Sequence, residues 1–396
     1  MIRRIFPAIL MAAICVGQVL ADGNKPYITR IYDFVPAPGQ FVNEVPEWSE
    51  GVDRDSIIRQ VSEYLCGYEK NGKPALPGVP VSLGAFGGYV VFGFDHPVVN
   101  VKDEYDLQIF GNSFQGDSTP TSSGSSEPGI VYVSRDDNHN GIPDDVWYEL
   151  AGSEYFHPKT QHNYAVTYYR QGPDHTPVPK PPFITDLEAI PWTSNDINPD
   201  STAGYLAENS FHRHSYWPGW IDADTLAFAG TKLRCNAVDR SGKGTDIMQY
   251  FFDWGYVDNR PDYDYGIGYN NKPLSSGMNL GFKIDWAVDE AGQPVVLDKI
   301  DFVKVQNAML QDCGWLGETS TEVGGAIDLH PDAVPDYDPE DVNRNGSVDI
   351  SDLNIVANFI LGIQTETEGI STDVNADGNT DISDLNRIID RILGVR

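Results

Sequence analysis

The sequence predicts a mainly β protein, in which a large β-sandwich is followed by a small all-α region at the C-terminus. Two observations lead to this prediction. Between residues 22 and 328 the apolar runs are short and alternating, Gly, Pro and aromatic residues are frequent, and helical periodicity is nearly absent. After residue 340, a twelve-residue polar pattern occurs twice, and each copy runs into a stretch with apolar residues at helical spacing.

Residues 1–21 have the pattern of a cleaved secretory signal peptide. Two arginines precede an apolar run over 5–19, and small residues stand at both positions that a signal peptidase reads before cleavage after Ala21. A lipid anchor on Cys15 is the alternative, although Ile14 stands where that route requires a smaller residue. No later stretch approaches the ~20 apolar residues that cross a bilayer. The sequence therefore predicts a secreted or cell-surface protein without a membrane span.

Composition limits the ligands that the chain can bind. The formal net charge is −31, from 58 acidic and 27 basic residues. This charge disfavours nucleic acid and anionic membranes as ligands, and it suits cation sites and a neutral ligand such as a glycan. Signal cleavage would leave Cys66, Cys235 and Cys313, so at most one disulfide forms in an oxidising compartment. Which pair joins stays open.

The middle region, 22–328, is expected to contain one helix and many short strands. Apolar residues recur on one helical face over 55–65 after an acidic start, and this helix should cover an end or edge of a sheet. Strands are expected at 88–94, 106–110, 129–134, 146–151, 164–169, 232–238, 281–288 and 299–306. No segment repeats, which disfavours a propeller or solenoid. Whether the strands form one sandwich or two stays open.

A loop between two expected strands predicts a calcium site. Within 135–145 the pattern Asp-x-Asn-x-Asn-Gly places four oxygen ligands, together with the carbonyl of Ile142, around one cation: Asp136, Asn138, Asn140 and Asp144. Position 12 of this loop is Trp147, so a carboxylate from elsewhere must complete the shell. The alternative is a hairpin without metal, since Asn, Asp and Gly also build turns.

Aromatic residues next to Asp and Asn predict a ligand-binding surface. We expect four of them to be exposed and to stack on the apolar faces of sugar rings: Trp217, Trp220, Tyr263 and Tyr265. The alternative is that these rings fill the cores and edges of the sandwich. Asp258, Asp262 and Asp264 offer another possible cation site in the same part of the chain.

The sequence contains no G-x-S-x-G, H-E-x-x-H, P-loop or Rossmann pattern, so it does not predict a particular reaction. The strongest candidate for a metal or catalytic site is the Phe-His-Arg-His segment at 211–214. His212 and His214 would share one face if this segment were a strand. Core or loop histidines without such a role are the more common alternative. Paired carboxylates that hydrolyse glycosidic bonds leave no local pattern, so an enzyme stays possible.

The two C-terminal repeats have the ligand pattern of calcium loops. Oxygen-bearing side chains stand at positions 1, 3, 5, 9 and 12 and glycine stands at position 6, as a cation with six to eight oxygen ligands requires. The expected ligands of the first ion are Asp341, Asn343, Asn345, Asp349 and Asp352, and those of the second are Asp373, Asn375, Asp377, Asp381 and Asp384. The repeats therefore predict two calcium ions, in addition to one at 136–144.

This tail, residues 341–396, resembles a type I dockerin, in which a helix follows each calcium loop. The resemblance implies calcium-dependent folding and docking to a cohesin domain on another protein. Clostridial dockerins typically carry Ser-Thr at loop positions 10 and 11, whereas this chain has Ile350-Ser351 and Ile382-Ser383, which implies another cohesin specificity. Most apolar helix residues are expected to pack between the repeats. The residues left to face the partner are Ser351, Asn354, Ser383, Asn386 and Arg387, and 329–340 form a stiff linker.

The middle region also resembles known families. The segments 82–94, 106–112, 127–134, 254–259 and 300–306 resemble a family of bacterial cell-surface proteins common in Bacteroidetes. The strand at 131–134 with Trp147-Tyr148 downstream resembles galactose-binding jelly rolls, which implies a jelly-roll-like sandwich.

These observations predict a secreted, non-catalytic protein that binds a carbohydrate or another surface ligand and docks onto a cohesin-bearing partner. The context would be polysaccharide degradation or a surface assembly. One alternative is a glycoside or polysaccharide hydrolase with a dockerin, which two carboxylates about 5 to 9.5 Å apart in a cleft lined by Trp217 and Trp220 would favour. The other is a structural subunit, which the absence of any concave or aromatic site would favour.

Overall fold

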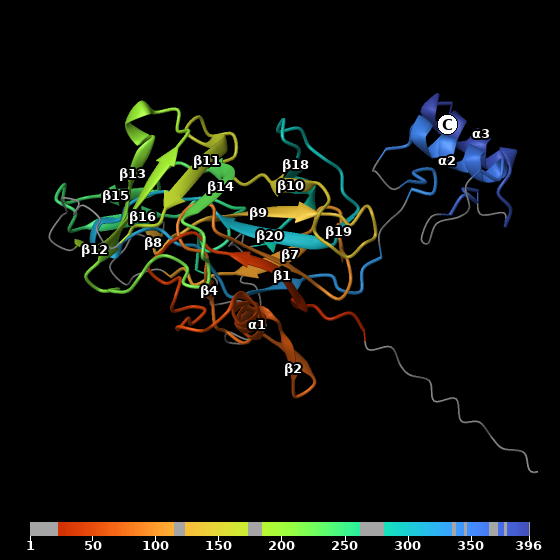
Figure 1. Cartoon of the computed structure of the whole chain (residues 1–396). Coiled ribbons are helices and arrows are strands. Elements are labelled where there is room, and N and C mark those ends of the chain that lie inside the picture. The colour runs from red at the N-terminus through yellow and green to blue at the C-terminus, as the bar shows by residue number, and fades with distance from the viewer. Residues whose placement is uncertain are drawn as a thin grey trace, which may run out of the picture.

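The computed structural model describes residues 23–114, 123–172, 184–261, 281–334, 338–343, 347–363, 371–375 and 378–395. It confirms a mainly β chain with a small helical C-terminal region. Within the described residues the α-helices are α1 (Arg54–Leu65), α2 (Ile350–Ile360) and α3 (Ile382–Ile392). Short 3₁₀ turns and strands make up the rest of the regular structure (Figure 1).

A six-stranded antiparallel sheet forms the centre of the β region. Its strands are, in spatial order, β1 (Arg30–Val35), β5 (Tyr89–Gly93), β20 (Phe302–Asn307), β9 (Gly129–Ser134), β10 (Trp147–Leu150) and β18 (Ala287–Val288). In β9 every residue except Tyr132 is buried. Strands covered on both faces are apolar almost throughout instead of alternating, which explains the Gly-Ile-Val-Tyr-Val-Ser sequence.

One face of this sheet packs against a second layer of short strands. That layer contains β17 (Gly281–Phe282), β7 (Leu107–Phe110) and β22 (Gly325–Asp328), with the pairs β19 (Lys299–Ile300) to β6 (Val98–Val99) and β21 (Glu322–Val323) to β4 (Val81–Ser82). Phe92, Val131 and Val303 of the large sheet share one buried cluster with Leu107 and Ile109 of β7. The two layers therefore form the predicted β-sandwich.

Helix α1 covers this sandwich, as the sequence predicts. Its buried residues Ile57, Val61 and Leu65 join the same cluster, and the helix contacts β1, β4 and β22. The carboxylate of Asp53 caps the helix by accepting a hydrogen bond from Ser56 N at 2.9 Å.

A third layer covers the other face of the six-stranded sheet (Figure 1). Its strands are β13 (Ala203–Asn209), β12 (Ile184–Ser194), β11 (Gln161–Tyr169) and β14 (Thr225–Lys232). Tyr168 packs in a cluster with Phe86 and donates a hydrogen bond to its carbonyl oxygen at 3.0 Å. Gln306 of β20 donates to Ala229 O of β14 at 3.2 Å. The β region thus has two cores that share one sheet.

The remaining strands are β15 (Ala237–Asp239), β16 (Ile247–Tyr250) and β8 (Ser123–Gly124) in one sheet, and the hairpin β2 (Tyr68–Lys70) to β3 (Lys73–Ala75). The prediction of one strand over 232–238 is wrong, because β14 ends at Lys232 and β15 starts at Ala237. Between them, the buried Asn236 amide donates to Ser126 O and Tyr250 O at 3.1 Å each, so it fixes a turn.

The strand expected at 281–288 is also interrupted. A 3₁₀ turn at Ile284–Trp286 separates β17 from β18. The buried carboxylate of Asp106 accepts a hydrogen bond from Ile284 N at 2.7 Å, so this backbone group bonds a side chain instead of a neighbouring strand. The long strands β12 and β13 were not among the expected elements.

Cys66, Cys235 and Cys313 are all free thiols. The segment expected to be a signal peptide lies outside the described residues. Among the residues that are described, no helix combines the length and hydropathy that a membrane crossing requires.

Candidate functional sites

The two C-terminal repeats have the same loop geometry. The buried carboxylate of Asp352 accepts hydrogen bonds from Asn343 N and Asp349 N, both at 2.9 Å. In the second copy Asp384 accepts from Asn375 N at 3.0 Å and from Asp381 N at 2.8 Å. Each carboxylate at loop position 12 thus accepts from the backbone amides at positions 3 and 9 and holds the two ends of its loop together. This closure brings the ligand side chains of the loop around one point. Asp349 and Asp381 hold position 9 of their loops, and Asp352 and Asp384 hold position 12.

The oxygen atoms in each loop suit a hard cation. Asn343 donates from its amide nitrogen to Ser351 Oγ at 2.5 Å, and Asn375 donates to Ser383 Oγ at 2.7 Å, so the amide oxygens point away from those hydroxyls. Gly378 N donates to a carboxylate oxygen of Asp373 at 2.8 Å, which closes the turn at position 6. These carboxylate and amide oxygens are the donors that calcium prefers.

The same residues start the helices. Asp349 and Asp381 are the N-caps of α2 and α3, and Asp352 and Asp384 complete the capping boxes. Hydrogen bonds from Ser351 lower the pKa of the Asp349 carboxyl below its ordinary value. Two of the expected ligands, Asn345 and Asp377, lie outside the described residues. Loop closure and helix initiation thus depend on the same carboxylates.

These repeats define a calcium-binding docking module. Residues 339–393 match the family model of the dockerin type I domain. The C-terminal region is accordingly a dockerin, a domain type that binds calcium, docks onto a cohesin-type partner and typically occurs in extracellular proteins. No match to the chain was found among curated proteins.

The structure changes the expected partner surface of the dockerin. Asn354 and Asn386 are exposed, as predicted, but the Ser351 and Ser383 hydroxyls bond within their own loops. Arg387 donates to Glu340 at 2.7 Å, and Glu340 is buried, so this arginine holds residues before the first loop against α3.

The prediction that most apolar helix residues pack between the repeats is wrong. Val356 and Ile388 are buried together with Val342 and Val374. In contrast, eight apolar side chains on equivalent positions of the two repeats are exposed, because two short helices leave part of their apolar surface uncovered: Ile350, Ile360, Leu361, Ile363, Ile382, Ile392, Leu393 and Val395. The sequence repeat was the signal for this surface, since all four pairs are related by the same offset in sequence.

The loop at 136–144 brings together the four residues expected to hold a third cation. The carboxylate of Asp136 accepts from Asn140 N at 3.0 Å and from Gly141 N at 2.9 Å. Asn138 and Asn140 both donate amide hydrogens to Asp144. Asp301 comes from outside the loop, and its carboxylate accepts a hydrogen bond from Asp136 N at 2.9 Å. This carboxylate is therefore a candidate for the ligand that the loop itself does not supply.

The prediction that Trp217 is exposed on an aromatic surface is wrong. This indole is only 1% exposed, because it packs in the core beneath the third layer and donates to Ile221 O at 3.3 Å. Trp220 is half-buried and stacks on Phe34 with 6.2 Å between ring centroids. Tyr263 and Tyr265 lie outside the described residues.

Other aromatic residues line a cavity of about 470 Å³ in the β region. Phe41, Phe114, Phe211 and Trp315 contribute the rings, and the last three are 55%, 64% and 38% exposed. Phe211 and Trp315 meet edge to face at 6.2 Å. Four segments far apart in sequence thus supply one apolar wall, and sequence patterns give no signal for such a wall.

Polar groups complete the cavity. The lining includes Glu127, Asn209 and Glu318. Burial raises the pKa of Glu318 to about 8, so its carboxyl is mostly neutral at pH 7. One of its oxygens accepts from Gln40 N at 2.5 Å, while the other is buried and makes no hydrogen bond with the residues that the structure describes. This cavity therefore contains a neutral carboxyl that can bond a ligand.

Behind the cavity lies a group of three carboxyls: Glu127, Asp258 and Glu322. Oxygen atoms of the three lie within 4.8 Å of one another. Asp258 accepts hydrogen bonds from three backbone amides, of Asn112, Ser113 and Glu322. Burial raises the pKa of Glu127 and of Glu322. Of the three aspartates expected to form a cation site in this part of the chain, the structure describes Asp258. Asp262 and Asp264 lie outside the described residues.

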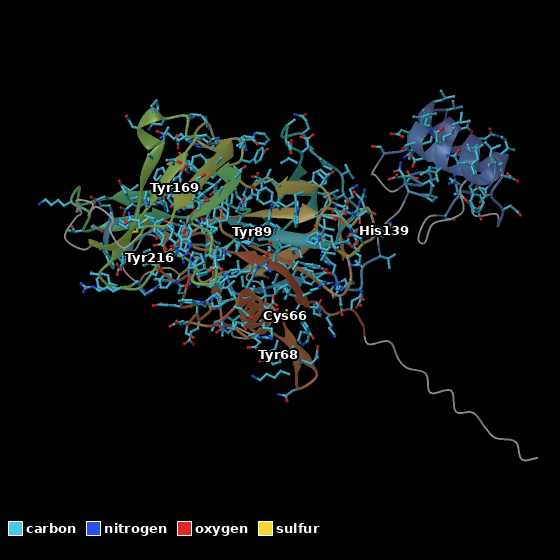
Figure 2. All side chains as sticks on the ribbon, viewed as in Figure 1. Cys66, Tyr68, Tyr89, His139, Tyr169 and Tyr216 are labelled. Atoms are coloured by element: carbon cyan, nitrogen blue, oxygen red, sulfur yellow. The ribbon has the colours of Figure 1, made fainter. Side chains whose placement is uncertain are left out.

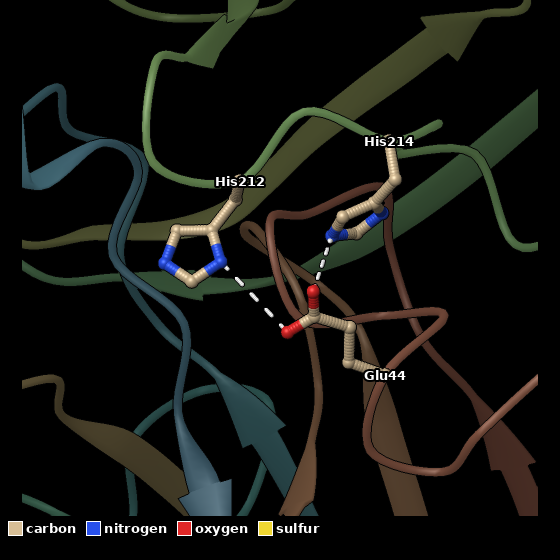
Figure 3. A group of neighbouring side chains, drawn as sticks. All are labelled: Glu44, His212 and His214. Carbon is tan, nitrogen blue, oxygen red and sulfur yellow. Dashed lines mark ion pairs between the residues drawn. The ribbon is translucent and has the colours of Figure 1, made fainter.

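A histidine pair lies at the edge of the same cavity (Figure 3). His214 Nε2 is 3.2 Å from one oxygen of Glu44, and His212 Nδ1 is 3.8 Å from the other. The segment 211–214 is a loop after β13 and not a strand, so the expected reason for their proximity is wrong. Both rings nevertheless face one carboxylate, and His212 also lines the cavity. Figure 2 shows His139 of the 136–144 loop at the opposite end of the β region from Tyr216, which follows this histidine pair.

Proposed function

We propose that the β region binds a neutral ligand, such as a glycan, in the aromatic cavity without transforming it, and that the dockerin attaches it to a cohesin-bearing partner outside the cell. The observation that carries this proposal is a cavity whose mouth is lined by exposed rings and whose wall includes the neutral Glu318 carboxyl, one oxygen of which makes no hydrogen bond with the described residues. A role in polysaccharide degradation or surface assembly, and export through residues 1–21, belong to the same proposal.

The chemistry of the lining supports a neutral ligand with hydroxyl groups. Ligand sites of this kind are concave, have volumes of about 300–1,000 Å³ and combine apolar walls with a few polar groups. Rings such as Trp315 and Phe211 can stack on apolar faces, while the Glu318 carboxyl can bond a hydroxyl. An anionic ligand would meet a chain of net charge −31.

Trp315→Ala is expected to weaken glycan binding about tenfold, since one aromatic contact contributes roughly 1 kcal/mol beyond area burial. The measurement is binding of the full chain to a glycan array in calcium, followed by titration of the strongest glycan. Phe156→Ala is the matched control, because this ring is 80% exposed and does not line the cavity. Equal affinity of wild type and Trp315→Ala, or no glycan bound at all, would contradict the proposal.

Ile350→Asp with Ile382→Asp is expected to weaken docking at least about 100-fold, because buried apolar anchors at interfaces contribute about 2 kcal/mol or more each. These side chains are 64% and 66% exposed, so the helices should remain intact. Surface plasmon resonance over a panel of immobilised cohesin domains measures the loss. Val334→Asp, at a residue that is 80% exposed outside the helices, is the control. Unchanged affinity would place the docking surface elsewhere.

Hydrolysis of glycosidic bonds is a second candidate, supported by one observation. Glu127 and Glu318 line the same cavity, and such enzymes use two carboxyls. Burial raises the pKa of both side chains, which suits a general acid but disfavours the ionised carboxylate that such an enzyme also needs. Release of reducing ends that is lost in both Glu127→Gln and Glu318→Gln would favour this candidate. The concave aromatic site disfavours a purely structural subunit.

A further inference from the structure

We propose that Glu44, His212 and His214 form a site for one divalent transition-metal ion of the zinc class at the edge of the aromatic cavity (Figure 3). Two imidazole nitrogens and one carboxylate are a common donor set for such an ion, and they differ from the all-oxygen sets of the calcium loops. The site can hold its ion whether or not the cavity contains a ligand.

The distances fit tetrahedral coordination. Ligand atoms about 2.0–2.2 Å from a tetrahedral ion are separated from one another by roughly 3.4 Å. The His214–Glu44 and His212–Glu44 separations are 3.2 and 3.8 Å, and all three candidate ligand atoms lie within 4.8 Å of one another. Small side-chain rotations therefore suffice to bring all three onto one ion.

The tautomer of His214 also fits a metal ligand. Its Nδ1 lies 3.0 Å from the carbonyl oxygen of Ser215, so Nδ1 carries the hydrogen and donates it. Nε2 then has a lone pair that faces a carboxylate oxygen of Glu44, and it makes no hydrogen bond among the described residues. With a neutral imidazole two acceptors face each other, and a cation, either a proton or a metal ion, must lie between them. Metal-binding histidines usually donate their other N–H to a carbonyl or carboxylate in this way.

The backbone around the three residues is fixed before any ion binds. Asn43, next to Glu44, donates to Ser215 O at 2.6 Å and to Trp217 O at 2.9 Å. It also accepts from Gly219 N at 2.9 Å. Asn209 Oδ1 accepts from His212 N at 3.0 Å. These bonds hold the loop of Glu44 against the loop of both histidines, which lowers the entropic cost of assembling the site.

Three protein ligands leave the fourth position of a tetrahedral ion open. His212 is also part of the cavity wall and packs on Phe41 at 4.5 Å between ring centroids, so the proposed ion would border the cavity. A hydroxyl or carbonyl oxygen of a bound ligand can reach it. The metal would then orient the ligand at the cavity edge.

The test is isothermal titration of ZnCl₂ into the full, tag-free chain with the calcium loops saturated, and visible spectroscopy with Co²⁺ as a second probe. Wild type is expected to bind one zinc ion in a step that Glu44→Gln and His214→Ala each weaken at least about 100-fold, since even outer-shell changes cost 10–100-fold. The Co²⁺ spectrum should show four-coordinate absorption without a thiolate band. Near-ultraviolet circular dichroism checks that each variant is folded.

His139→Asn and Cys235→Ser are the matched controls, because both side chains are exposed and offer zinc ligands away from the histidine pair. Both variants should bind zinc as wild type does. Wild-type affinity in Glu44→Gln and His214→Ala, or loss of the step in either control, would overturn the assignment and leave Glu44 and the histidines as a simple ion pair. Since zinc is titrated alone, the result does not depend on the proposed glycan.

Discussion

Asp341→Ala together with Asp373→Ala is expected to unfold α2 and α3 and to abolish docking, even in saturating calcium. These residues hold position 1 of the two loops, and the loop carboxylates also cap the helices. Because ligand binding and folding of such a module are coupled, loss of both ions removes the free energy that orders it. Hydrogen exchange of 350–360 and 382–392 measures the helices directly.

Asp136→Ala is the matched control for this pair of substitutions. It removes the same type of residue from the loop in the β region, and it should leave exchange protection of both dockerin helices unchanged. Chelation of calcium should reproduce the effect of the double substitution in the wild-type chain. Helices that stay protected after chelation, with docking retained, would refute calcium-dependent folding.

At pH 9, Glu318→Gln is expected to stabilise the β region by about 2–4 kcal/mol relative to wild type. A pKa shift of several units between the folded and unfolded states has an effect of this size on the free energy of unfolding. Burial raises the pKa of Glu318 in the folded chain to about 8, against an ordinary value of 4.5. The folded state therefore holds a proton that the unfolded state loses above pH 4.5. Wild-type stability should fall as pH rises from about 4.5 to 8, whereas the glutamine variant should lose less.

Urea unfolding at pH 5, 7 and 9, followed by tryptophan fluorescence, measures this difference. All 8 tryptophans precede the dockerin, so the signal reports the β region alone. Burial also raises the pKa of Glu149, to about 7. This residue should therefore preserve part of the dependence of stability on pH in the Glu318→Gln variant. Glu290→Gln, at an exposed position, serves as the control for removal of a charge. Identical pH dependence in wild type and Glu318→Gln would show that Glu318 is ionised when folded.

The dockerin and the sandwich could be predicted because their determinants are local in the sequence. The Asp-x-Asn-x-Asn-Gly spacing specifies a ligand geometry within one loop, and the six residues of β9 identify a strand covered on both faces. The helix at 54–65 follows from apolar periodicity and the Asp53 cap. In each case the residues that decide the structure are within about twelve positions of one another.

The burial of Trp217 and the aromatic cavity could not be predicted, because the residues that determine them lie far apart in the sequence. Trp217 stands in a Ser-Tyr-Trp-Pro-Gly-Trp segment that resembles an exposed loop, yet a third sheet layer buries it. The cavity joins residues near 41, 127, 211, 248 and 315, which only the sheet order brings together. Within this set, the Phe-His-Arg-His segment alone had a local signal, and it lies at the edge of the cavity as a loop and not as a strand.

The central claim is that the β region binds a glycan without cleaving it, and mass spectrometry tests this most directly. The full chain in calcium would be incubated with an equal amount of its strongest array glycan, and the glycan would then be recovered. We expect the protein to retain the glycan, and the glycan to be recovered at its original mass. Shortened products, formed by wild type and not by Glu127→Gln, would contradict it and make the protein a hydrolase.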